Sequence, residues 1–348
     1  MVKKSAVICV IFTLIFSSCA SSNAASTDTS AKEPDWIRNP YTKYDRQTNA
    51  AAVGNGNSRE TAEKDALGKL AALFGQSIQV DEKVSTSYRD AVRNGVIANW
   101  SENTASDINI VTSASLDSLV GAEIGEVWDD GRGNNYAVAV LNKARAIQVY
   151  SGMIKSYQEM IEKLITMNQG EKNSLEGFSR YQLAASLADI NTSYGNVLSV
   201  LGAAAPVGLK NGADYRLEAQ NIARAIPVGL AVINDKSERI QGAFAKALSD
   251  LGFISGGINP RYMLDVVINT SPVEFPNNTN IFIRIELSAN FTDANSGTVL
   301  LPYNFNNREG HITQEQAENR VYTTAELKIN EEYKNILSDY LSRLLQKK

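Results

Sequence analysis

The chain has 348 residues, of which 43% are hydrophobic and 21% charged, with a formal net charge of -4 and a pI near 5.3. This length suits two domains of ordinary size, and the lack of a basic surplus argues against a nucleic-acid-binding protein. Cys9 and Cys19 are its two cysteines, and His311 is its one histidine. These counts exclude disulfides, zinc–cysteine sites, iron–sulfur clusters and thiol catalysis beyond residue 19. They favour a protein that is not an enzyme, for which we expect no catalytic residues, no metal site and no cofactor.

The N-terminus has the pattern of a secretory signal peptide, predicted over residues 1–18. Lys3 and Lys4 precede the apolar run Ala6–Phe16, which has only Thr13 as a polar residue. A run of this length cannot span a bilayer core of about 30 Å, so a transmembrane helix is not expected.

The end of the signal resembles a bacterial lipobox, in which a large apolar residue and two small residues precede a cysteine. Here the residues are Phe16, Ser17, Ser18 and Cys19. The resemblance implies that Cys19 is the lipid-modified first residue of the mature protein, because its thiol can form a thioether to diacylglycerol. The alternative is ordinary signal cleavage after Ala24 or Ala25.

The next segment, residues 19–33, is predicted to be a flexible tether because it has almost no large apolar residue. A first α+β domain is then expected over 34–147. In it a short strand, Ala50–Val53, leads to a helix capped by Asn57 and Glu60 and ended by Gly75. Further strands are expected at 77–88, 119–127 and 136–141.

The middle of the chain predicts a long antiparallel helical hairpin over 148–205. Apolar residues recur there at alternating spacings of three and four in two stripes separated by residues 168–170. The stripes are Ile147, Tyr150, Ile154, Tyr157, Ile161 and Leu164, then Leu183, Leu187, Ile190, Tyr194, Val197 and Leu201. They could pack within the chain or support a homo-oligomer.

A second α+β domain is expected over 226–348, in the order β-α-β-β-β-α. Its helix is expected to be capped by Asp235 with Glu238 and closed by Gly252. The segment Ile281–Phe291 alternates strictly between apolar and polar residues, which predicts a strand with one buried face. A last helix is predicted over 313–345. The fold class is thus α+β, with two small domains joined by the hairpin.

The first domain resembles the lipoprotein-twenty family, whose domain also occurs at the N-terminus of flagellar assembly protein T. The resemblance rests on Pro34-Asp35-Trp36, on Gly54-Asn55-Gly56 and on the regularly spaced alanines of the following helix. It implies a bacterial surface or periplasmic lipoprotein. More weakly, residues 292–300 of the second domain look like the domain of curli-secretion lipoproteins and of activators of penicillin-binding proteins.

Four groups of residues are candidate sites. Gly54 and Gly56 before a helix could cradle a phosphate, but Arg59 replaces the third glycine of the dinucleotide motif, so a tight turn is favoured. The run from Asp129 to Asn135 lacks the spacing of a calcium loop and predicts a hairpin turn. His311 is expected to be a solvated loop residue, with a general base as the alternative. The tryptophans are expected to pack in or beside the core: Trp36, Trp100 and Trp128.

These observations predict a lipid-anchored cell-envelope protein with a binding or structural role. The expected partners are the membrane, through the lipid on Cys19, and envelope proteins or peptidoglycan, with no nucleic acid. Ala20 is not the aspartate that retains some lipoproteins in the inner membrane, so the outer membrane is expected. The alternatives are an assembly factor for flagella, secretion or wall synthesis and, more remotely, an envelope hydrolase.

Overall fold

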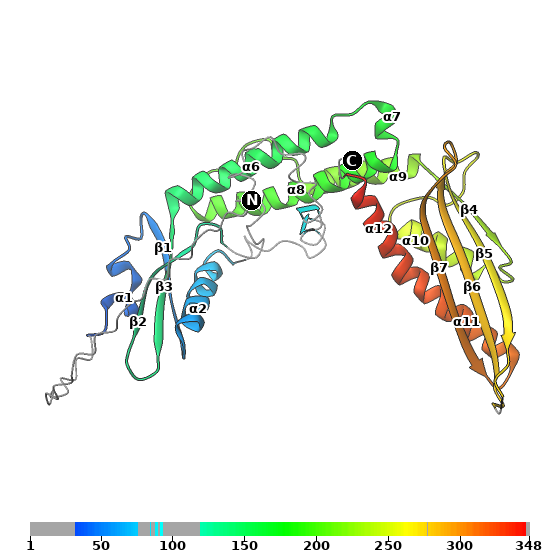
Figure 1. Cartoon of the computed structure of the whole chain (residues 1–348). Coiled ribbons are helices and arrows are strands. Elements are labelled where there is room, and N and C mark those ends of the chain that lie inside the picture. Colours follow the sequence, from blue (N-terminus) through cyan, green and yellow to red (C-terminus); the bar gives the residue numbers. More distant parts are fainter. Residues whose placement is uncertain are drawn as a thin grey trace, which may run out of the picture.

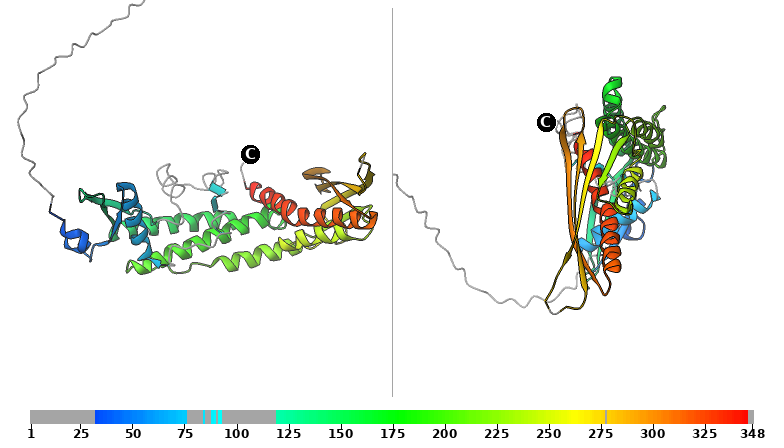
Figure 2. Two further views of the ribbon diagram at one scale, coloured as in Figure 1. Left: turned by 90° about the horizontal axis from the view of Figure 1, so that it is seen from below. Right: turned by 90° about the vertical axis from the view of Figure 1, so that its right-hand side faces the viewer.

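The computed structural model describes residues 32–75, 84, 88, 89, 91, 92, 119–276 and 278–345. Two small sheets lie at opposite ends of a group of long helices, and both extend to the same side of these helices, so that the molecule resembles an arch (Figure 1). Figure 2 shows the helices running along the whole length between the sheets. The α+β expectation with a connecting helical hairpin is confirmed.

The N-terminal sheet has three antiparallel strands in the order β1-β3-β2. The strands are β1 (Asn49–Gly56), β2 (Glu123–Asp129) and β3 (Asn135–Asn142). The helical elements of this domain are α1 (Asp35–Arg38), a 3-10 turn (Pro40–Thr42) and α2 (Arg59–Ala72). Helix α2 is capped by Ser58, whose side chain accepts a hydrogen bond from the Thr61 backbone N–H at 3.2 Å. The expected cap at Asn57 is therefore wrong by one residue, which is within the usual uncertainty of helix ends.

Both faces of this sheet are covered. On one face, alanines of β1 and β3 lie under the buried α2 residues Ala62, Ala66 and Leu70. On the other face, Trp36 of α1 is buried against Ala51, Val138 and Val140. The alanine side chains on the face toward α2 are small, so this helix can lie very close to β1 and β3.

Strand β3 continues directly into the helical hairpin of α6 (Lys143–Ile165) and α8 (Leu175–Val200), with the short α7 (Gln169–Lys172) between them. The predicted stripes are buried except for Ile147, which is partly buried. A third helix, α9 (Gly212–Ala225), packs on α8. No element is predicted at 206–225, although Asn211 as a cap and Tyr215, Ala219 and Ile222 at helical spacing are a readable signal.

The C-terminal sheet has the order β4-β5-β6-β7, with β4 parallel to β5 and the other pairs antiparallel. Its strands are β4 (Val228–Ile233), β5 (Tyr262–Val273), β6 (Ile281–Asp293) and β7 (Thr298–His311). Its helices are α10 (Arg239–Asp250), α11 (Gln314–Lys328) and α12 (Lys334–Arg343), with a π-helical turn at Ile329–Tyr333. The predicted order β-α-β-β-β-α is confirmed.

Two details of the second domain differ from expectation. The expected cap at Asp235 is wrong, because Glu238, in a left-handed conformation, is the N-cap residue of α10 and makes no side-chain cap. The Asp235 carboxylate, three residues earlier, still accepts a hydrogen bond from the backbone N–H of Gln241 in the first turn, at 2.9 Å. The structure has two helices, α11 and α12, where one last helix was predicted. They are separated by the π-helical turn at Ile329–Tyr333, which contains one residue more than an α-helical turn. Periodicity alone cannot reveal such a turn, because the buried positions continue on both sides of it.

The strand predicted at 77–88 and the sequence around Trp100 lie largely outside the described residues. Val84 and Tyr88, which are described, have helical conformation, so a strand is wrong at these two residues. Both side chains are buried, and the Tyr88 hydroxyl is hydrogen-bonded to that of Tyr157 in α6.

The buried core runs from the N-terminal sheet through the hairpin to the C-terminal domain without a break. One direct link is the backbone N–H of Leu175 in α8, which donates to the Tyr262 hydroxyl of β5 at 3.5 Å. Because one buried core crosses the predicted domain limits at 34–147, 148–205 and 226–348, these limits stay a prediction.

Candidate binding surfaces

The proposed lipid site, Cys19, and most of the tether lie outside the described residues, so lipidation stays a prediction. The described chain begins at residue 32, immediately before α1. Within the ranges given above, no helix is both long enough and apolar enough to cross a membrane.

The glycines of the Gly54-Asn55-Gly56 motif lie within strand β1 and do not form the expected turn. A Cβ atom at Gly54 would overlap the backbone of Ala62 and Ala66 in α2, and one at Gly56 would contact Thr61. The motif therefore permits close packing of helix on strand.

The turn between β2 and β3 is a tight polar hairpin turn, as expected. Asp130 accepts hydrogen bonds from the backbone N–H groups of Arg132 and Asn134 and from the Asn134 side chain. Its pKa is lowered, first by the bond from the Asn134 side chain and then by the two backbone bonds. The carboxylate is thus engaged in holding the turn. Across the described part of the chain, no group of three or more His, Cys, Asp or Glu residues could hold a metal ion.

His311 is the last residue of β7, paired with Ile281 of β6, and not a loop residue as expected. It is half-buried, and its Nδ1 atom is buried with no hydrogen-bond partner among the described residues. Its neighbour Glu309 accepts bonds from Asn307 and Thr324 at 3.0 Å, which fixes that carboxylate against α11.

Two of the three tryptophans pack as expected. Trp36 is buried under the N-terminal sheet, and Trp128 packs on Tyr136 with ring centroids 5.6 Å apart. Trp100 lies outside the described residues.

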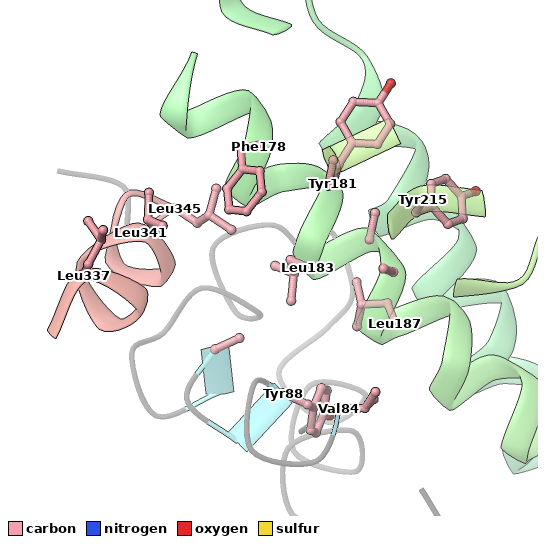
Figure 3. Packing of buried hydrophobic residues seen from close by; sticks show 14 of the residues in the cluster. Val84, Tyr88, Phe178, Tyr181, Leu183, Leu187, Tyr215, Leu337, Leu341 and Leu345 are labelled. Atoms are coloured by element: carbon pink, nitrogen blue, oxygen red, sulfur yellow. The ribbon is translucent and has the colours of Figure 1, made fainter. Parts of the chain in front are cut away.

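A cavity of about 260 Å³ lies where the hairpin meets the C-terminal domain. Figure 3 shows buried apolar side chains of this region, with Leu345 beside Phe178 of α8 and Leu183 farther along the same helix. Its polar lining includes Ser179, Gln182 and Asp250. The pKa of Asp250 is lowered, mainly by the hydrogen bond from Lys246. Sequence periodicity does not predict this cavity, because Ala91 and residues at α8, α10 and α12 form it, and these segments are distant in the chain.

Within the described residues, the C-terminal sheet has helices on one face only, as the right-hand view of Figure 2 shows. Ile283, Ile285 and Leu287 point from β6 toward the helices and are buried. The opposite face, here called the outer face, is formed by polar residues of β5, β6 and β7. Its centre is a shallow depression of about 330 Å³.

The side chains at the centre of the outer face are amides, a hydroxyl and a carboxylate. They belong to Asn269, Glu286, Ser288, Asn304 and Asn306, with Val267 beside them. In the described parts of the chain, the side chains of Asn269, Ser288, Asn304 and Asn306 form no hydrogen bond with another residue. The alternation of Ile281–Phe291 predicted this polar face, but only the register of β7 shows which asparagines lie beside it.

The comparison with known protein families gives a match in the N-terminal part of the chain. Residues 34–142 match the LPP20 lipoprotein family. No curated protein matches the chain. The likeness of residues 292–300 to curli-secretion and penicillin-binding-protein-activator lipoproteins stays a prediction.

Two solved structures similar to this chain are both distant in sequence. The secreted protein HP1454 from Helicobacter pylori is 14% identical over 86% of this chain and 99% of its own, with a TM-score of 0.42. A minor lipoprotein from Acinetobacter baumannii is 14% identical over 34% of this chain and 92% of its own, with a TM-score of 0.25.

The family match covers the residues that carried the resemblance, from Trp36 through the Gly54-Asn55-Gly56 motif to the end of β3. Residues 34–142 therefore match the domain of the LPP20 lipoprotein family.

Proposed function

We propose that this protein is a lipid-anchored component of the bacterial cell envelope with a non-enzymatic binding or structural role. The observation that carries the proposal is the LPP20 lipoprotein domain beginning at residue 34, shortly after the lipobox-like residues that end at Cys19. A domain in this position would follow the lipid after a short tether. Since no cysteine follows residue 19 and His311 is the one histidine, common nucleophilic and metal chemistries have few possible residues.

The anchor would be a lipid and would not be a protein helix. Each buried methylene of an acyl chain contributes about 0.8 kcal/mol, so two or more chains hold a protein stably at a membrane. Because Ala20 follows Cys19, the proposed location is the outer membrane.

For the binding role, we propose the outer face of the C-terminal sheet. It is a rigid surface of amide and hydroxyl groups with no partner within the described chain, which suits a polar partner such as an envelope protein or peptidoglycan. The apolar stripes of the hairpin are buried within the chain, so a homo-oligomer through the hairpin would have to use its remaining surface.

The anchor is tested by replacing Cys19 with alanine in cells. We expect Cys19→Ala to abolish labelling by radioactive palmitate and to move the protein from the detergent phase to the aqueous phase. Cys9→Ala is the matched control, since Cys9 lies within the signal and should leave both properties unchanged. Labelling that persists in Cys19→Ala would contradict the proposal.

The binding face is tested by a photo-crosslinking residue in intact cells. Placed at Asn304 on the outer face, it should capture an envelope component. Placed at Asn335, an exposed residue of α12, it should not. Equal capture at both positions, or at neither, would argue against the outer face as the binding surface.

A further inference from the structure

The far end of the C-terminal sheet carries an apolar group that no other element of the described chain covers. We define it as the distal tip, made of Phe275, Ile281, Phe282 and Ile312, in which Ile281 lies on the helix-covered side of β6 and Phe282 on the outer face. Ile312 is 76% exposed and Ile281 40% exposed, while the two phenylalanines are partly exposed. These residues lie where β5 ends, β6 begins and β7 leads into α11.

The aromatic part of the distal tip is held in a fixed arrangement. The rings of Phe275 and Phe282 meet edge to face with centroids 4.6 Å apart, and the Arg308 guanidinium lies 4.7 Å from the centre of the Phe275 ring. The Phe282 ring also lies over Gly310, where a Cβ atom would clash with it. Packing therefore presents these rings at the surface, because no nearby part of the described chain buries them.

The distal tip is at the end of the sheet that is remote from the hairpin. Val273 pairs with Phe282 at this end, whereas Tyr262 pairs with Asp293 at the other end, next to α8. Figure 1 shows that this end of the sheet and α1, where the described chain begins, lie on the same side of the arch.

The position of the tether indicates what could cover this surface. Between Cys19 and residue 32 the chain can extend at most about 45 Å, at roughly 3.3–3.6 Å per residue. A lipid on Cys19 would therefore keep the α1 end of the arch close to a bilayer. The distal tip, on the same side, would then face that bilayer too.

We propose that the distal tip enters the interfacial layer of a lipid bilayer and gives the protein a second membrane contact. This inference rests on the proposed lipid anchor. Exposed isoleucine and partly exposed phenylalanine beside an arginine are suited to the boundary between headgroups and acyl chains, where apolar side chains are buried and the guanidinium stays solvated.

The charges near the distal tip are of both signs. Glu274 precedes Phe275, Arg308 and Glu309 belong to the end of β7, and the Arg320 guanidinium donates to the Gly310 carbonyl at 3.2 Å. Burial of apolar surface would therefore dominate over attraction to anionic lipids. We expect contact with zwitterionic and anionic vesicles alike, with little dependence on salt.

The test uses the mature chain from residue 20 to 348, which has no cysteine. The protein carries an N-terminal histidine tag, which binds a chelator lipid in phosphatidylcholine vesicles. This attachment replaces the natural anchor, so the result does not depend on lipidation of Cys19. A fluorophore sensitive to polarity is attached at Asn280→Cys, beside the distal tip, or at Asn295→Cys, in the turn at the opposite end of β6. The two labels are separated by the length of β6, about 40 Å.

We expect the label at position 280 to shift to the blue on tethering and to be quenched by lipids carrying a shallow bilayer quencher. The label at position 295 should change little. Adding Phe275→Ser and Ile312→Ser should abolish the shift at 280 and weaken binding of the untethered chain to vesicles by about tenfold or more. Circular dichroism of the double variant verifies that the domain is folded.

An unchanged label at position 280 on tethered vesicles would overturn the proposal, as would equal shifts at 280 and 295. A shift that also appears when chelator beads replace vesicles would indicate contact between protein copies, and would overturn it too. Palmitate labelling that persists in Cys19→Ala cells would contradict only the anchor, so the two failures are distinguishable.

Discussion

The two sheets of this protein are packed in opposite ways. The N-terminal sheet is covered on both faces, by α2 on one and by Trp36 with its neighbours on the other. The C-terminal sheet is larger, with strands of 12 to 14 residues in β5, β6 and β7, yet helices cover one of its faces only. A sheet closed on both faces is suited to carry a tether, and an open sheet offers a surface to a partner.

The side chains explain this difference. In β1 and β3 both sets of alternating residues are small or apolar, so each face needs a cover. In β6, buried Ile285 and Leu287 alternate with exposed Glu286 and Ser288. The cost of leaving the outer face in water is therefore low, since its side chains are already hydrated.

The largest expected effect comes from opening the closed sheet. Trp36 is 4% exposed, and Trp36→Ala should lower the free energy of unfolding of the N-terminal domain by about 3–5 kcal/mol. Asn304→Ala on the outer face of the other sheet should change stability by no more than about 0.5 kcal/mol. Urea unfolding followed by circular dichroism measures both. Similar losses in the two variants would mean that the outer face is covered in solution.

A smaller effect is expected from the contact between α2 and β1. Gly54→Ala places a methyl group against the backbone of Ala62 and Ala66, and should cost about 1–3 kcal/mol through overpacking. Gly68 lies in the same helix with no atom near the position of a Cβ. Gly68→Ala should therefore stabilise the domain by about 0.5–1 kcal/mol through helix propensity.

Thermal unfolding of the two glycine variants provides the comparison. Opposite shifts of the melting temperature would support direct packing of helix on strand. If Gly54→Ala is neutral, the close approach of α2 to β1 is not maintained in solution.

The smallest effect concerns pH and the C-terminal sheet. Burial alone would raise the pKa of Asp293, but hydrogen bonds from Arg261 and from the Asn295 backbone overcome it, and the pKa is lowered. A carboxyl with a folded pKa below its unfolded value near 3.9 stabilises the fold above that value, and this contribution is lost as pH falls through the folded pKa.

Asp293→Asn should therefore cost about 1 kcal/mol at pH 7, a value reduced by solvent because Arg261 is 44% exposed. The difference from the wild type should decrease as the pH falls below about 4. Asp265→Asn, at an exposed position of β5, should have almost no effect. A destabilisation of Asp293→Asn that is the same at pH 3 and pH 7 would contradict the ion pair as its source.

Much of the architecture could be predicted from the sequence because local patterns were strong. The alternation of Ile281–Phe291 and the spacing of Tyr150, Ile154 and Tyr157 directly reflect which side chains are buried. The same information predicted the order of elements in the C-terminal domain. Helix α9 was missed although its cap at Asn211 was readable.

Features that depend on distant parts of the chain could not be predicted in this way. The role of Gly54 depends on how closely α2 approaches, and the cavity beside Leu183 depends on α8, α10 and α12 meeting. The outer face could be predicted only in part. The polar residues of β6 are evident from the alternation, whereas the asparagines of β7 are located only by the strand register. Local periodicity contains no information on such contacts between elements.

The proposed lipid anchor requires that the mature protein begins at a lipid-modified Cys19. Mass spectrometry of the N-terminal peptide from protein purified out of cell membranes tests it directly. We expect a peptide that starts at Cys19 and carries a thioether-linked diacylglyceryl group. A peptide that starts after Ala24 or Ala25, without lipid, would contradict the account.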